Sequence, residues 1–440
     1  MFTKNFSSLK LLLVTCCVAG ITVTHSTAQP SHDDFMRDAA VCADNYLAYP
    51  EPKGVSLTPA PAGYEVFYLS HYGRHGSRWL IGRTAYEKAY DVLKEAADSA
   101  QLTDKGLALM ASIDTLRQWA HGRDGELTPL GARQHRGIAR RMYERFPELF
   151  QAGNKIEARS STVIRCILSM ANELAELQGH CPGLDMDMDA SSVDMTYINN
   201  KEKMDDGGKD KGSDGLTAFR ERHFSPVRLL NSLFRSEDYW HRHIDHPTRF
   251  VIDNIWKLYA DMQSLEPDRR VCMKGLFTDE ELYNIWLVRN AEWYTSHGPS
   301  LSGRSVQMLR QRHLLRNIVE KADSCLALAD NPAKSHVTAS LRFGHEVVVM
   351  PTVCMLNLNG YGARYDNLEQ LEQNEWYSYR IFPMASNIQI VFYRKPGADI
   401  LVKVLLNERE ATMPQLTPVY SSVYYKWSDL RKYCLDCIQE

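Results

Sequence analysis

The chain has 440 residues, of which 44% are hydrophobic and 24% are charged. These proportions are typical of globular proteins, exclude a fibrous or disordered chain, and allow two packed units. The formal net charge is −3 at pH 7. Because nucleic-acid-binding proteins are expected to be basic, we do not expect nucleic acid as a partner.

Residues 1–28 have the organisation of a secretory signal peptide. Two lysines precede a short apolar run, and small residues follow up to Ala28. The run is too short to span a membrane, and no other long apolar run follows it. We expect cleavage after Ala28 and an exported protein, periplasmic or extracellular. Lipid attachment at Cys16 or Cys17 is the less favoured alternative.

Eight cysteines follow this segment. An even number permits disulfide bonds in an oxidising compartment, although the sequence does not reveal their pairing. Cys434 and Cys437 form a C-x-x-C pair that lacks both the strand-to-helix setting of a redox motif and a second pair for zinc. A terminal disulfide or free thiols are the simplest interpretations.

The order of predicted elements indicates an α/β protein. The run "YEVFYL" predicts a strand at 64–69, and helical segments extend to about residue 120. Thr128 caps and Pro129 opens a further helix. Later signals predict strands and helices in turn: a strand at 155–160, a helix at 161–179, a strand at 335–344, a helix at 345–359, and strands at 387–395 and 399–408.

From 183 to 300 the sequence changes character: a polar, glycine-rich stretch leads into aromatic-rich helical segments. We therefore predict an α/β core formed by 29–182 and 301–440, and a mostly helical cap inserted at 183–300.

The segment "SHYGRHGSRWL" at 70–80 places Arg74, His75 and Arg78 directly after the first predicted strand. Ligands of α/β sheets collect at this end of the strands, and a helix starting there would bring both guanidinium groups to one side. Arginine gives planar, bidentate contacts to phosphate. A neutral imidazole beside such groups can attack phosphorus, and Gly73 and Gly76 would let the backbone approach the ligand. Alone, the segment fits a surface histidine equally well.

Two further strand-to-helix junctions carry residues of the same chemistry. Arg165 lies in the first turn of the helix after 155–160, where it could bind the same anion or simply face solvent. His345 and Glu346 open a helix after the strand that ends at Phe343, so His345 could donate to phosphate and Glu346 could protonate a leaving oxygen. A lone His-Glu pair is usually a chance helix start, but three such junctions together indicate a phosphate site.

The blocks "RHGSR", "LTPLGARQ", "RSSTVIR" and "GHE" resemble the histidine acid phosphatase family, branch 2 of the histidine phosphatase clan. Residues 385–414 are similar to multiple inositol-polyphosphate phosphatases and phytases. The resemblance implies a phosphoglycerate-mutase-like core and hydrolysis of inositol polyphosphates such as phytate, without metal or cofactor, through a phosphohistidine on His75. The implied phosphate-binding residues are Arg74, Arg78, Arg165 and His345, with Glu346 as the proton donor.

One position departs from the resemblance. The inositol phosphatases usually read His-Ala-Glu here, and the wider family reads His-Asp. Counted back from Pro351, Glu346 occupies the Asp position and Val347 the Glu position. A broad-specificity acid phosphatase therefore stays an alternative. So does a mutase-like enzyme, although Ser77 replaces its usual Glu. A non-catalytic polyanion-binding protein would need neither His75 nor Glu346.

Three other motifs are weaker. "HRHIDH" at 241–246 has the spelling of a zinc site but lacks a preceding buried strand, so we expect a polar helix edge. "DKGSDGLTAFRE" at 210–221 resembles a calcium loop, but Gly212 replaces a ligand and a flexible loop is favoured. Four lysines near this loop could contact additional phosphates, although solvent exposure is the default: Lys201, Lys203, Lys209 and Lys211.

Overall fold

The computed structural model describes residues 30–201, 213–299, 305–329 and 337–439. The predicted signal peptide and Lys203, Lys209 and Lys211 lie outside these ranges. Within them, no helix is long and apolar enough to cross a membrane.

The centre of the molecule is one eight-stranded mixed sheet with the order β3-β2-β4-β1-β5-β6-β7, and β8 pairs with β6. β3, β2, β4 and β1 are mutually parallel, whereas β5, β6, β7 and β8 pair antiparallel. The strands are β1 (Glu65–Arg74), β2 (Lys155–Ser160), β3 (Asp185–Asp189), β4 (Val337–Gly344), β5 (Asn387–Arg394), β6 (Leu401–Leu406), β7 (Arg409–Ala411) and β8 (Tyr425–Lys426). The carboxyl ends of β1, β2 and β4 therefore meet at one edge.

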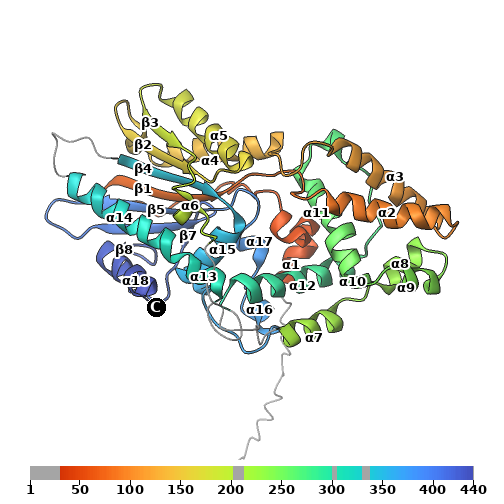
Figure 1. The fold of residues 1–440 in the computed structure, drawn as a ribbon. Coiled ribbons are helices and arrows are strands. Elements are labelled where there is room, and N and C mark those ends of the chain that lie inside the picture. The colour runs from red at the N-terminus through yellow and green to blue at the C-terminus, as the bar shows by residue number, and fades with distance from the viewer. Residues whose placement is uncertain (1–29, 202–212, 300–304, 330–336, 440) are drawn as a thin grey trace, which may run out of the picture.

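Helices cover both faces of this sheet (Figure 1). On one face α4 (Pro129–Arg145) and α5 (Ile164–His180) pack with the strands in one apolar core. On the other face α14 (Arg312–Ala329), α15 (Glu346–Met355) and α18 (Trp427–Gln439) form a second core. The N-terminus of α4 is as predicted: Pro129 opens the helix, and the Thr128 hydroxyl accepts a hydrogen bond from the Gly131 backbone. This arrangement confirms the predicted α/β fold class.

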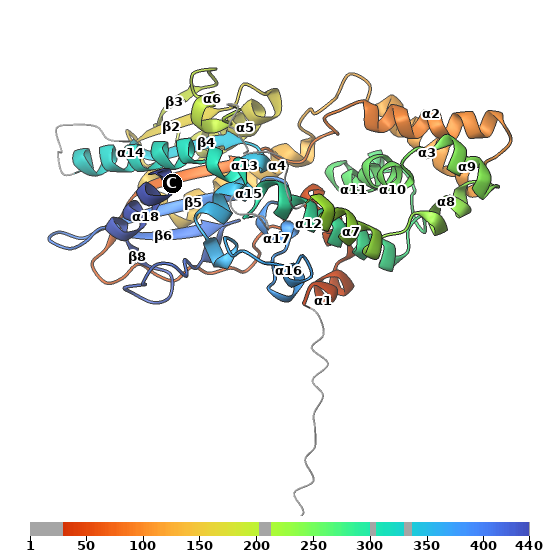
Figure 2. The same cartoon turned by 60° about the horizontal axis from the view of Figure 1, so that its bottom comes forward.

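A separate helical lobe lies beyond the carboxyl edge of the sheet (Figure 2). It has its own apolar core, contributed by residues from Phe35 to Met384. Its main helices are α2 (Thr84–Asp98), α3 (Asp104–Trp119), α8 (Val227–Leu233), α9 (Glu237–His243), α10 (Pro247–Phe250), a π-helical turn (Val251–Trp256), α11 (Lys257–Asp261) and α12 (Asp279–His297). α7 (Ser213–His223) lies beside α12.

The lobe differs from the predicted insertion at 183–300 in two respects. α2 and α3, predicted as part of the α/β core, contribute their apolar faces to the core of the lobe. Conversely, β3 falls within the predicted insertion but pairs in parallel with β2 at the edge of the sheet.

Short elements complete the described chain. They are α1 (Pro30–Arg37), α6 (Met195–Ile198), α13 (Val306–Arg310), α16 (Gln370–Gln373), α17 (Ser378–Ile381), and 3-10 turns at Ala39–Tyr46, Pro147–Phe150, Met262–Ser264, Pro267–Arg269 and Leu358–Gly360. The eight cysteines are free thiols, and the buried pair Cys434 and Cys437 lies on α18.

Candidate active site

The strand before the predicted phosphate site extends past its expected end at residue 69. β1 continues to Arg74 and pairs with β4 up to Gly344. The segment after Arg74 is not helical, because α2 begins only at Thr84. The expectation that Arg74 and Arg78 share one side of a helix is therefore wrong. Arg78 is held instead by an isolated bridge to Leu127, which precedes α4.

Residues of the "LTPLGARQ" block hold this loop in place. The Gln134 side chain accepts a hydrogen bond from the Ser77 backbone at 2.8 Å and donates one to the Ser77 hydroxyl at 3.0 Å. The Thr128 hydroxyl donates to the Ser77 carbonyl at 3.0 Å. The sequence indicated only a capping role for Thr128 and none for Gln134, although both belong to a block that resembles the family.

Glycines allow close packing around the loop. A Cβ added to Gly76 would lie 2.5 Å from the Gly131 carbonyl oxygen, and one on Gly131 would lie 2.2 Å from that of Ser77. A Cβ on Gly73 would meet the His71 ring at 2.7 Å. The structure therefore gives Gly73 and Gly76 a packing role, against the His71 ring and against α4; their role in ligand approach stays a prediction.

The geometry of His75 suits a nucleophile. Its Nδ1 lies 2.9 Å from the Gly76 carbonyl, which can only accept, so Nδ1 carries the hydrogen. Among the described residues Nε2 has no hydrogen-bond partner, and it lies 3.4 Å from Glu346 Oε2. Burial lowers the pKa of His75 well below its usual value, although Glu346 opposes this shift. Nε2 therefore presents a lone pair at neutral pH.

Arg74 directs the Nε–Nη2 edge of its guanidinium group toward the Glu346 carboxylate, beside His75 Nε2. Nη1 donates to the backbone carbonyls of Asn45 at 2.6 Å and Phe382 at 2.9 Å. Nε lies 3.1 Å from Glu346 Oε2, and Nη2 has no hydrogen-bond partner within the described part of the chain. An Nε–Nη2 edge is the fork that binds two phosphate oxygens.

Arg78 and Arg165 contribute two more guanidinium groups. Arg78 is buried, donates from Nη1 to the Trp79 carbonyl at 3.0 Å, and lies over the Tyr46 ring with its Cζ 5.5 Å from the centroid. Arg165 lies in the first turn of α5, and its proximity lowers the pKa of His75. The three arginines, predicted from two separate junctions, therefore act on one place: Arg74 and Arg78 lower the pKa of Glu346, and Arg74 and Arg165 lower the pKa of His75.

His345 and Glu346 lie where β4 gives way to α15, as predicted. The rings of His345 and His75 have centroids 5.7 Å apart. His345 Nε2 is 3.1 Å from the Ser161 hydroxyl, and Nδ1 is 3.5 Å from Arg165 Nη2. Burial lowers the pKa of His345 to about 4, so its ring is neutral.

The Glu346 carboxylate occupies the place between the nucleophile and the arginines. Burial raises its pKa, but Arg74 above all, with His75 and Arg78, outweighs this effect and holds the pKa well below its usual value. Glu346 is therefore ionised in the unliganded protein. A bound phosphoryl group would replace the carboxylate as the partner of Arg74.

His75, His345 and Glu346 also place their ligand atoms within 4.8 Å of one another, as a metal site would require. However, three guanidinium groups border these residues and oppose a cation, so the site fits an anion better. No other described residues form such a group. His241 and His243 instead stack on the aromatic rings of Trp240 and Tyr239.

At residues 210–221 the flexible loop that the sequence favoured is wrong from Ser213 onward, because Ser213–His223 form helix α7, which also argues against the calcium loop; residues 210–212 lie outside the described residues. Of the four lysines, Lys201 is described; it is exposed, and its charge contributes to lowering the pKa of His345.

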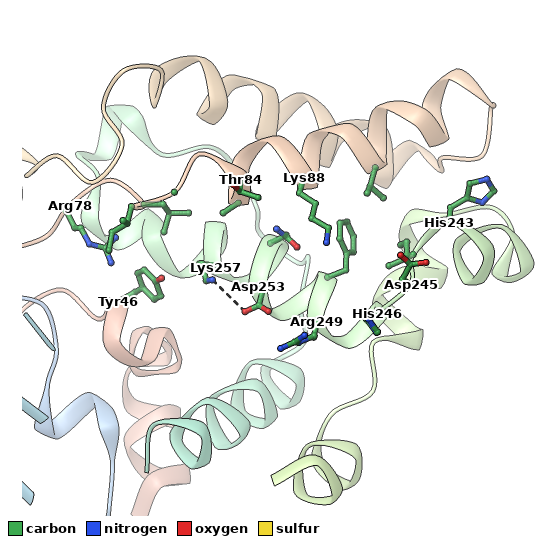
Figure 3. Close-up of a pocket in the computed structure, with 18 residues that line it drawn as sticks. Tyr46, Arg78, Thr84, Lys88, His243, Asp245, His246, Arg249, Asp253 and Lys257 are labelled. Atoms are coloured by element: carbon green, nitrogen blue, oxygen red, sulfur yellow. Dashed lines mark ion pairs between the residues drawn. The ribbon is translucent and has the colours of Figure 1, made fainter. Parts of the chain in front are cut away.

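A cavity of about 600 Å³ leads from Arg78 into the helical lobe (Figure 3). Lys88 of α2 and Arg249 of α10 line it, as does Lys257, which pairs with Asp253 at 3.6 Å. A smaller cavity of about 380 Å³ shares Arg249 and Asp253 and continues to α12. Lys88, Arg249 and Lys257 were not predictable as site residues, because isolated basic residues on amphipathic helices carry no motif.

The sequence model of the histidine phosphatase superfamily (branch 2) matches residues 73–407. The chain belongs to this superfamily. The predicted family and the assignment of a phosphatase are thereby confirmed, and the enzyme acts on phosphate esters.

Among curated proteins, this phosphatase is 22% identical to multiple inositol polyphosphate phosphatase 1 of Gallus gallus over 413 residues, which cover 86% of this chain and 83% of that protein. Among solved structures, the Bifidobacterium longum multiple inositol polyphosphate phosphatase in complex with inositol hexasulfate has a TM-score of 0.72 at 20% identity, covering 89% and 96% of the two chains. The phytase from D. castellii has a TM-score of 0.63 at 14% identity, covering 91% and 85%. These structures share the fold.

Proposed function

We propose that this phosphatase hydrolyses inositol polyphosphates such as phytate through a phosphohistidine intermediate. The observation that carries the proposal is the position of His75 Nε2, which is buried close to Arg74 and Arg165, lies 3.4 Å from Glu346 Oε2, and has no hydrogen-bond partner by geometry among the described residues. A neutral imidazole in such a place can attack an electrophile that the cations bind.

The reaction proceeds in two steps. In the first, His75 Nε2 forms a bond to phosphorus, the bond to the ester oxygen breaks, and that oxygen takes a proton from Glu346. The arginine edges stabilise charge on the equatorial oxygens. In the second, the Glu346 carboxylate takes a proton from water, the water oxygen bonds to phosphorus, and the bond to Nε2 breaks. Free phosphate leaves, Glu346 releases to solvent the proton that it took up when the anionic substrate bound, and both residues regain their starting states.

The cavity supports a substrate with several phosphates. Lys88 and Arg249 lie along it beyond Arg78, and neither forms an ion pair with another described residue. Cations that line the cavity beyond Arg78 would bind further phosphates of the same inositol ring. The similar proteins, which include inositol polyphosphate phosphatases and a phytase, favour the same substrate class.

Phosphohistidine trapping tests the chemistry. Acid-quenched enzyme mixed with substrate should carry phosphate on the peptide that contains His75, and His75→Ala should abolish both the label and turnover. A label on another peptide, or near-normal turnover of the variant, would contradict the mechanism.

A substrate panel tests the specificity. Lys88→Met and Arg249→Met should each raise the KM for phytate several-fold and leave p-nitrophenyl phosphate nearly unaffected. Arg242→Met, on the same lobe but outside the cavity lining, is the matched control. Equal efficiency on phytate and simple phosphomonoesters would indicate a broad acid phosphatase instead, and phosphate transfer to an acceptor alcohol would indicate a mutase. Binding without turnover would indicate a non-catalytic homologue.

We also propose that the protein is exported, on the strength of the N-terminal pattern of charge, apolar run and small residues. Expression of the full chain should give an N-terminus at residue 29 outside the cytoplasm, and deletion of residues 2–28 should retain the protein inside. An intact N-terminus on cytoplasmic protein would overturn this proposal.

A further inference from the structure

Asp44 combines two unfavourable features in one residue. It interrupts the 3-10 turn Ala39–Tyr46 with φ 55° and ψ −126°, a backbone conformation that residues other than glycine rarely adopt. Its side chain is completely buried, and burial raises the pKa of its carboxyl group. Strain and a buried acid that persist together indicate a functional constraint.

The carboxylate of Asp44 is held by helix α12, which links the lobe to the sheet. Trp293 Nε1 donates a hydrogen bond to Asp44 Oδ2 at 3.0 Å. Arg289 Nε lies 3.5 Å from the same oxygen. Both side chains also line the smaller cavity, which shares Arg249 and Asp253 with the larger cavity proposed for substrate.

The backbone after Asp44 leads directly to the catalytic arginine. The carbonyl of Asn45 accepts from Arg74 Nη1 at 2.6 Å, and that of Phe382 accepts from the same nitrogen at 2.9 Å. The Trp293 ring packs edge-on against Phe382, with centroids 4.8 Å apart. Trp293 therefore contacts Phe382, whose carbonyl binds Arg74, and it fixes the Asn45 carbonyl through Asp44.

These two carbonyls decide which edge of Arg74 is free. A terminal guanidinium nitrogen carries two hydrogens, and Nη1 directs both to these carbonyls. Nε and Nη2 therefore point toward Glu346 and the space for the phosphoryl group. If the Asn45 carbonyl moved, the guanidinium group could rotate and the two-pronged contact would be lost.

We propose that Asp44 is a positioning residue for Arg74. Helix α12 holds Asp44 through Arg289 and Trp293, so that the Asn45 carbonyl orients the phosphate-binding edge of the Arg74 guanidinium group. The inference rests on the proposed function only for the role of Arg74, which binds the phosphoryl group during its transfer to His75.

Asp44→Gly tests the proposal, because glycine adopts this backbone conformation without strain and the variant should fold. We expect kcat to fall about tenfold to a hundredfold, as small displacements of catalytic groups do. The loss should be equal for phytate and p-nitrophenyl phosphate, and inhibition by vanadate should weaken by a similar factor. Asp44→Asn, which keeps an acceptor for Trp293, should retain more activity. The matched control is Glu375→Gly: Glu375 also has a positive φ, 54°, and an ion pair, but it lies outside the site.

A double-mutant cycle separates positioning from general stability. In an Arg74→Lys background, Asp44→Gly should cause little further loss. A full additional loss there, or a kcat within twofold of wild type for Asp44→Gly, would overturn the proposal. Should Asp44→Gly misfold, Trp293→Phe keeps a ring against Phe382, removes the donor and should give the same coupling to Arg74. Wild-type enzyme without phosphatase turnover would instead refute the proposed function.

Discussion

Glu346→Gln is the sharpest test of the chemistry, because the structure gives this residue an ionised state that a proton donor cannot keep. Its Oε2 lies 3.1 Å from Arg74 Nε and 3.4 Å from His75 Nε2, and its pKa is held low. Two unit charges 4 Å apart interact by about 4 kcal/mol at an effective dielectric constant of 20. Each negative charge of a bound phosphoryl group beside Glu346 therefore raises the pKa of this carboxyl group, because the two like charges repel. Substrate binding itself can therefore protonate the donor.

The expected effect of Glu346→Gln depends on the leaving group. With an alkyl phosphate such as phytate, the leaving alcohol needs the proton, and kcat should fall on the order of 10²–10⁴-fold. With p-nitrophenyl phosphate the phenolate departs unaided, so phosphorylation should slow far less. Dephosphorylation would then limit turnover, and rapid mixing should show a burst of p-nitrophenol stoichiometric with enzyme.

Phosphate binding supplies an independent readout. Because the carboxylate competes with phosphate for Arg74, Glu346→Gln should bind inorganic phosphate more tightly than the wild type does. Rapid-quench measurement of the phosphorylation step with both substrates decides the matter. Equal losses for the two would refute the reasoning, make Glu346 structural, and require a donor from elsewhere in the molecule.

Three further outcomes are expected. Chelator treatment should leave turnover unchanged while Arg78→Lys lowers kcat by losing the planar fork; activity that EDTA removes and zinc restores would contradict this. Gln134→Leu leaves the Ser77 backbone donor unsatisfied and should lower the free energy of unfolding by about 1–3 kcal/mol, read by urea titration, together with kcat. Burial lowers the pKa of His71 to about 3. Between about pH 6.5 and pH 3 the unfolded chain therefore binds a proton that the folded chain does not, and the free energy of unfolding decreases as the pH is lowered. His71→Gln should reduce the loss between pH 7 and pH 4 by roughly 3 kcal/mol; an unchanged pH slope would contradict it.

The parts of the fold that were predictable are those with apolar periodicity and caps. The β1 strand and α4 had both signals, whereas the end of β1 was misjudged because Ser70 and His71 are polar. In the structure both side chains are buried in the sheet. β3 was missed because "DMDMD" has few apolar residues; as an edge strand it needs only one partner and stays largely exposed. The packing of α2 and α3 in the lobe was not predictable, because an amphipathic face does not identify what it packs against.

The candidate site divides in a similar way. The side chains whose chemistry is rare in combination, such as His75 with Arg74 and Glu346, were identifiable from the sequence, and the structure brings them together. The groups that orient these side chains were not identifiable from the sequence. Gln134 acts through its amide on a backbone, and the carbonyls that hold Arg74 belong to Asn45 and Phe382.

A backbone carbonyl is available from every residue type, so selection for its position leaves no side-chain signature. What it leaves at this site is a conformation, the positive φ of Asp44, and a buried acid that α12 compensates from about 250 positions along the chain. The identity of Arg74 therefore determines that phosphate can be bound, and the placement of Asn45 and Phe382 determines which edge binds it.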